Sequence, residues 1–167
     1  MATLILLRHA KSSWKDSTLN DFDRPLNLRG RNDAKKIGNR LLELNVIPNV
    51  IISSSSTRTK ETVSILKSEI GESISTYFTF DLYHANQNTI MQHFLKYYKH
   101  KCRIMIVGHN PGIQILFENL SGIDIANYPT CSFSFFRCNK EQEFSLLNFE
   151  SPKRILFLSK KGIQKGN

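Results

Sequence analysis

TLILLRHAKSS, at residues 3–13, is the stretch from which the fold prediction follows. Four apolar residues, Leu4 to Leu7, precede Arg8 and His9, and small or polar residues come next. A short apolar run with a polar end is typical of a strand buried on both faces of a mostly parallel sheet. In open α/β sheets, ligands bind at the carboxyl ends of the strands, where the departing loops enclose a crevice. Arg8 and His9 are therefore expected at a ligand-binding edge, and their charge suits an anionic substrate.

The rest of the chain alternates apolar strands with amphipathic helices. The pattern predicts strands at 49–53, around 77–80 and at 103–107. It predicts one helix from the N-cap Asn27 to about 45 and another that follows the polar cluster at 54–59 and runs to about 70. Two more helices are expected, one over 86–98 and one with Pro111 at its first helical position. Strands at 131–138, 144–149 and 154–158, joined by short polar turns, favour antiparallel pairing at one edge. This order predicts an α/β fold, a three-layer αβα sandwich with a mostly parallel central sheet.

Length and composition predict one domain over residues 1–160 and a short basic tail at 161–167. The formal net charge of +9 favours acidic partners. There is no arginine-rich run, zinc-finger spacing or interleaving of basic and aromatic residues, so nucleic acid is not expected as a partner. No apolar stretch approaches the length of a membrane span, so no membrane association is expected either. A monomer is the default expectation.

Cysteine and histidine usage bears on the compartment and on metals. The three cysteines, Cys102, Cys131 and Cys138, are too few and too irregular for a disulfide framework, and no signal peptide precedes the first strand. We therefore expect a reduced, cytoplasmic protein. The five histidines form no metal-ligand spacing, so neither a metal nor a cofactor is expected.

Three predicted strand ends carry cationic or imidazole side chains. Arg8 and His9 follow the first strand, Arg58 opens the helix after the second, and His109 follows the strand at 103–107. Alone, His109 would be a capping or packed residue and Arg58 a surface residue; their joint placement favours a shared site. Helix N-termini nearby add backbone N–H donors, so the crevice suits a phosphoryl group. Arginines can stabilise phosphoryl transfer, and a histidine can act as a nucleophile that forms a covalent phosphoenzyme.

Four motifs in this order resemble those of the histidine phosphatase superfamily. LLRHA at 6–10 resembles the Arg-His-Gly signature with alanine in place of glycine, and RPLNLRG at 24–30, SSSSTRTKET at 53–62 and VGHNPG at 107–112 resemble the other three. The short chain, the RHAKSSW opening and the absence of a large inserted cap are most similar to the SixA-type phosphohistidine phosphatases. The resemblance implies a phosphoglycerate mutase-like fold.

The resemblance also implies roles for individual residues. His9 corresponds to the nucleophile, Arg8 and Arg58 to the residues that clamp the phosphate, and His109 to a residue that stabilises the transferring group. Phosphoglycerate mutase relatives have a phosphate-contacting asparagine after the tryptophan, whereas Lys15 stands there in this chain. Ser12 or Lys15 is the substitute that the sequence offers for that contact.

A second departure concerns the general acid. Many relatives use a glutamate after the third strand, where this chain has FDLYHA, and Asp81 and His84 are the nearby alternatives. Alkoxides need a proton in order to leave, whereas imidazole leaves readily from a phosphoramidate. The sequence therefore favours a metal-independent phosphohydrolase that removes phosphate from phosphohistidine in proteins. A phosphomonoesterase for small phosphate esters, with the same mechanism, and a non-catalytic phosphate- or phosphoprotein-binding module are the alternatives.

Overall fold

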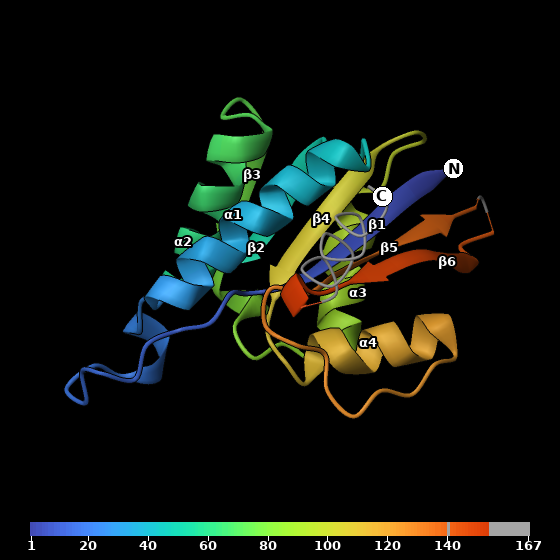
Figure 1. The fold of residues 1–167 in the computed structure, drawn as a ribbon. Helices are drawn as coiled ribbons and strands as arrows, with labels where there is room; N and C mark the ends of the chain where they lie inside the picture. The colour runs from blue at the N-terminus through green and yellow to red at the C-terminus, as the bar shows by residue number, and fades with distance from the viewer. Residues whose placement is uncertain (140, 154–167) are drawn as a thin grey trace, which may run out of the picture.

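A single mixed sheet forms the centre of the computed structural model, which describes residues 1–139 and 141–153 (Figure 1). The described strands are β1 (Ala2–Arg8), β2 (Val50–Ser54), β3 (Ser75–Thr79), β4 (Arg103–Gly108), β5 (Phe133–Cys138) and β6 (Phe144–Glu150), in the order β3-β2-β4-β1-β5-β6. The first four pair in parallel, and β5 and β6 are antiparallel at one edge. The predicted mostly parallel sheet with an antiparallel edge is confirmed. The predicted strand at 154–158 lies outside the described residues.

Helices cover both faces of the sheet. The described helices are α1 (Leu28–Glu43), α2 (Thr57–Ile70), α3 (Gln87–Tyr97) and α4 (Gly112–Ser121), with short 3-10 turns η1 (Asp21–Asp23) and η2 (Phe80–Leu82). The side chains of α1 and α2 pack on one face, and those of α3 and α4 on the other (Figure 1). Among the described residues, no helix has both the length and the apolar character needed to cross a membrane.

Strand β1 supplies both halves of the core. Leu4 and Leu6 point toward α3 and α4, whereas Ile5 and Leu7 point toward α1 and α2, because side chains alternate between the faces of a strand. All four are fully buried. This explains why the apolar run in the sequence is continuous and has no polar alternation.

Asparagine side chains cap two helices, at the predicted N-cap Asn27 and at Asn86, which the sequence pattern places inside its helix. The Asn27 side chain accepts a hydrogen bond from the Gly30 amide at 2.8 Å, and Asn86 caps α3 in the same way. The prediction for the last helix is wrong by one position, since Pro111 is the N-cap and α4 begins at Gly112.

Two aromatic residues in the connection at residues 10–26 find different kinds of partner. Phe22 does pack against the rings of Phe80 and Tyr83. Trp14 is 72% exposed, and its indole stacks on the guanidinium of Arg24, 3.2 Å from the ring centroid. A guanidinium is weakly hydrated and stacks well on aromatic faces, so the tryptophan finds a partner without entering the core.

The first turn of α1 fits closely against the loop that follows β1. The Asn27 amide donates to the Lys11 carbonyl at 3.0 Å, and a Cβ atom on Gly30 would lie only 2.1 Å from the same carbonyl oxygen. Only glycine allows this approach, which fixes the backbone two residues after His9.

We predict that Gly30→Ala lowers the free energy of unfolding by about 1–3 kcal/mol, because the added methyl group forces α1 away from the loop. The measurement is urea unfolding. Asn32→Ala, at an exposed position of the same helix, is the control and should change stability by no more than about 0.5 kcal/mol. Equal effects of the two substitutions would show that the close contact does not matter.

Candidate active site

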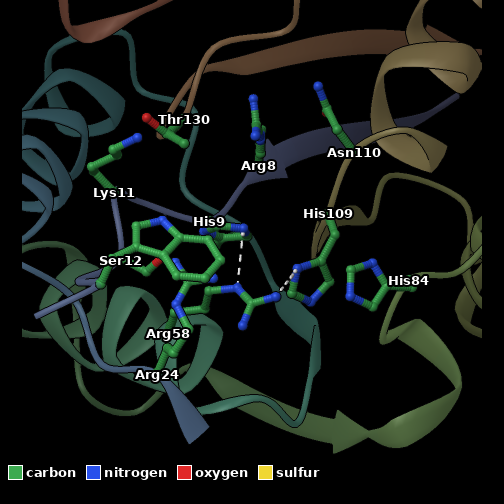
Figure 2. A pocket seen from close by; sticks show the side chains of 11 residues that line it. Arg8, His9, Lys11, Ser12, Arg24, Arg58, His84, His109, Asn110 and Thr130 are labelled. Atoms are coloured by element: carbon green, nitrogen blue, oxygen red, sulfur yellow. Dashed lines mark hydrogen bonds between the residues drawn. The ribbon is translucent and has the colours of Figure 1, made fainter. Parts of the chain in front are cut away.

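The order of the strands brings the predicted site residues together. Strand β4 lies between β1 and β2, so the residues that follow these three parallel strands meet at one edge. The His9 amide donates to the Gly108 carbonyl at 3.1 Å, which links the two strand ends. A cavity of about 300 Å³ opens there (Figure 2). It is lined by Arg8, His9, Lys11, Ser12, Trp14, Arg24, Arg58, His84, His109, Asn110 and Thr130.

The backbone fixes the tautomer of His9. Its Nδ1 lies 2.7 Å from the carbonyl oxygen of Ala10. Because a carbonyl can only accept, Nδ1 carries the proton and Nε2 keeps its lone pair. Arg58 Nε donates to this Nε2 at 3.3 Å. The unprotonated nitrogen therefore faces the arginine.

Arg58 links the two histidines. Its side chain is 3% exposed, and its Nη2 lies 3.3 Å from Nδ1 of His109 and 2.8 Å from Oδ2 of Asp21. Nη1 donates to the Asp21 carbonyl. Figure 2 shows the guanidinium between the two imidazole rings, whose centroids are 4.9 Å apart. Asp21 thus holds Arg58 from the side away from the histidines.

His109 is oriented from both of its ring nitrogens. Because the Arg58 guanidinium donates to Nδ1, Nε2 carries the proton and donates to Ser54 Oγ at 2.9 Å. Ser54 is the last residue of β2, so that strand positions the imidazole of the neighbouring loop.

Arg8 extends from the end of β1 on the other side of His9. Its Nη1 donates to the Tyr128 carbonyl at 2.6 Å and to Asn127 Oδ1 at 3.2 Å. Nε is buried and has no partner among the described residues. The Cys131 amide bonds to the carbonyl oxygens of Arg8 and His9, which fixes the backbone between them.

Burial and positive charge keep both histidines neutral. Desolvation, together with the charges of Arg58, Arg8 and Arg24, lowers the pKa of His9 to about 3. Desolvation, His9 and Arg58 also lower the pKa of His109. An anion in the cavity would act in the opposite direction, because it stabilises a protonated imidazole.

Of the residues that the sequence offers for the missing asparagine and the missing general acid, two line the cavity and two do not. Ser12 lines it, and its hydroxyl accepts from Arg24 Nη2 at 2.5 Å; His84 lines it too, stacked on His109 with ring centroids 5.3 Å apart. Lys15 is exposed and does not line the cavity, whereas Lys11 does. The structure does not bring Asp81 to the site: η2 turns its 69% exposed carboxylate toward His93, 3.6 Å away.

Sequence reasoning gave no role to two residues that organise the cavity. Arg24 lines it, and Asp21 accepts from Arg24, Arg58 and the Tyr83 hydroxyl at 2.6, 2.8 and 2.7 Å. Hydrogen bonds from Tyr83 and Arg58 hold the pKa of Asp21 low despite the desolvation that opposes them. Arg24 begins the motif at 24–30, which is the signal that could have identified it. Asp21 has no such signal.

The threonine of the motif at 53–62 has a structural role. Thr62 Oγ1 accepts from the Ala10 amide at 3.1 Å and donates to the Arg58 carbonyl at 2.7 Å. It therefore ties the loop after His9 to the helix that carries Arg58. Among the described residues, no group of three or more His, Cys, Asp or Glu side chains could hold a metal ion.

Comparisons with known proteins identify the family. The model of the histidine phosphatase superfamily (branch 1) matches residues 4–81. An uncharacterised chloroplastic protein of Arabidopsis thaliana is 32% identical over 155 residues, which cover 86% of this chain and 71% of that protein. The chain belongs to the histidine phosphatase superfamily.

Solved structures of this superfamily share the fold of the chain. A candidate phosphohistidine phosphatase SixA from Agrobacterium tumefaciens superposes with a TM-score of 0.81 at 26% identity, covering 90% of this chain and 97% of that one. The protein histidine phosphatase SixA complexed with tungstate gives a TM-score of 0.80 at 15% identity, covering 92% and 99%. The SixA-like form of the phosphoglycerate mutase-like fold is thus confirmed.

The lowered pKa of His9 predicts how stability depends on pH. In the unfolded chain, His9 binds a proton below its ordinary pKa of 6.5, whereas in the folded protein it stays unprotonated down to about pH 3. The free energy of unfolding should therefore decrease as the pH falls below 6.5, by about 2 kcal/mol at pH 5 for this histidine. Urea unfolding at pH 7 and pH 5, without phosphate or sulfate, should show a smaller decrease for His9→Gln than for wild type. Equal decreases would contradict the prediction.

Proposed function

We propose that the protein is a metal-independent phosphohydrolase that removes phosphate from phosphohistidine in proteins through a covalent intermediate on His9. One observation carries the proposal: His9 presents an unprotonated Nε2 to a cavity lined by Arg8, Arg24 and Arg58, with no carboxylate among the described lining residues. The superfamily and the SixA-like neighbours support phosphatase activity. The substrate and the roles of the residues are the proposed part.

In the first step, the phosphoryl group takes over the Arg58 Nε donor, which frees the lone pair of His9 Nε2. This lone pair attacks phosphorus, and the P–N bond to the substrate imidazole breaks. The arginines stabilise the negative charge of the transferring phosphoryl group. The negative charge of the phosphoryl group raises the pKa of His109, so that the His109 imidazole can donate a hydrogen bond to a phosphoryl oxygen. The substrate ring leaves as neutral imidazole when its other nitrogen carries a proton.

In the second step, water attacks the phosphorus of phospho-His9 and inorganic phosphate is released. Nδ1 keeps its proton throughout, because it donates a hydrogen bond to the Ala10 carbonyl at 2.7 Å. His9 therefore also leaves as neutral imidazole, and the step regenerates the tautomer with which the cycle began. The same hydrogen bond thus serves both halves of the reaction.

The leaving group argues for phosphohistidine over an ester. An alkoxide needs a strong acid beside it, and the nearest carboxylates are unsuitable. Asp21 is engaged by two arginines and a tyrosine, and Asp81 lies outside the cavity lining. Imidazole needs no such acid.

His84 keeps a second candidate function open, a phosphomonoesterase for small esters. Its ring lines the cavity beside His109, where it could protonate a leaving alcohol. If this is the function, wild type should hydrolyse small esters faster than a phosphorylated histidine-carrier protein. His84→Ala should then slow ester hydrolysis by at least about a hundredfold. For phosphohistidine hydrolysis, the same substitution should have a much smaller effect.

The nucleophile is tested by intact-mass spectrometry after mixing with a phosphorylated histidine-carrier protein and quenching without acid. Wild type should gain one phosphate transiently and release inorganic phosphate. His9→Ala should do neither, because it lacks the attacking nitrogen. His93→Ala, at a histidine outside the cavity lining, should behave as wild type.

Circular dichroism of His9→Ala separates loss of chemistry from loss of fold. If wild type turns over esters but not phosphohistidine, the proposed substrate is wrong. If it binds phosphate and turns over neither, the protein is a binding module.

A further inference from the structure

A second basic cavity adjoins the first. Its volume is about 330 Å³, and it shares Arg8, Lys11 and Thr130 with the cavity that contains His9. Beyond them it is lined by Arg29 at the start of α1, Asn127, Pro129 and Lys153. Figure 2 shows Lys11 and Thr130 at the end of the first cavity away from His84. The second cavity therefore extends the site on the side opposite His84.

The second cavity carries more positive charge than its surroundings balance. No carboxylate is among its described lining residues. Arg29 Nε lies 3.3 Å from Asp33, but the arginine side chain remains 58% exposed. Lys11 and Lys153 form no ion pair with any residue of the described part of the chain. An anion other than the transferring phosphoryl group is the ligand that this charge suits.

Arg8 joins the two cavities. Its Nη1 is held by the Tyr128 carbonyl and Asn127 Oδ1, so its guanidinium is fixed on a wall common to both. A phosphoryl group beside His9 and a second anion beside Arg29 would thus be bound on either side of Arg8. The two anions must belong to one molecule, or to neighbouring residues of one chain, for both to contribute to the affinity of one substrate.

We propose that this second cavity binds the carboxylate of an aspartate or glutamate close in sequence to the phosphorylated histidine of a protein substrate. The inference rests on the proposed function and adds a preference for acidic flanking residues. A peptide fits because its phosphorylated side chain enters the first cavity while a neighbouring side chain reaches the second. The cations are exposed, so the preference should weaken as salt rises.

Two peptides of equal length test the inference, each with a central phosphohistidine, one flanked on both sides by glutamates and the other by glutamines. Wild type should have a kcat/KM about tenfold higher for the glutamate peptide at low salt. The double variant Arg29→Gln/Lys153→Gln should lose most of this advantage through KM and keep its rate with the glutamine peptide. Lys96→Gln/Lys99→Gln removes the same charge outside both cavities and should keep the preference.

Binding separates failure of the inference from failure of the proposed function. Titration calorimetry uses the same two peptides with a non-hydrolysable phosphonate in place of the phosphoryl group. If wild type hydrolyses both phosphohistidine peptides equally, or if the Arg29/Lys153 variant slows both equally, the inference is overturned and the proposed function stands. If wild type hydrolyses neither peptide, yet binds the acidic phosphonate peptide more tightly and loses this difference in the double variant, the proposed function fails and the acidic subsite stands. Equal binding without hydrolysis overturns both.

Discussion

Burial of the Arg58 guanidinium is the constraint on which the site depends. A buried cation is costly unless its donors find acceptors, and here Asp21 supplies a carboxylate and a carbonyl on one side. The remaining donors point to Nε2 of His9 and Nδ1 of His109. Each of those nitrogens must be unprotonated in order to accept. The arginine therefore imposes the neutral state on both histidines.

The same network explains why neutral acceptors, and not carboxylates, orient the imidazole rings. A carboxylate on Nδ1 of His9 would raise its pKa and favour the protonated ring, which has no lone pair for attack. The Ala10 carbonyl fixes the tautomer without adding a full negative charge. Ser54 does the same for His109. Neutral acceptors thus keep the rings oriented and unprotonated at once.

Much of the fold could be predicted from the sequence because its signals are local. Continuous apolar runs mark the buried parallel strands, and Asn27 and Asn86 cap the helices they precede. The placement of His9, Arg58 and His109 at strand ends followed from the same pattern. The superfamily motifs gave the order of the site residues along the chain.

What could not be predicted depends on contacts between distant segments. Asp21 lies in a polar loop, and only the folded chain brings it to Arg58, 37 residues away. Asp81 and His84 were equivalent in sequence, but η2 directs one toward His93, while the other stacks on His109. Trp14 has the residue type of a buried anchor, yet it stacks on Arg24 at the surface.

The central position of β1 in the sheet has a consequence for synthesis on the ribosome. Its two neighbours are β4 and β5, which are translated roughly a hundred and more residues later. A nascent chain that has just gained His9 still lacks His109 and the Cys131 amide that fixes the backbone of Arg8 and His9. The proposed nucleophile is thus made well before the groups that complete its surroundings.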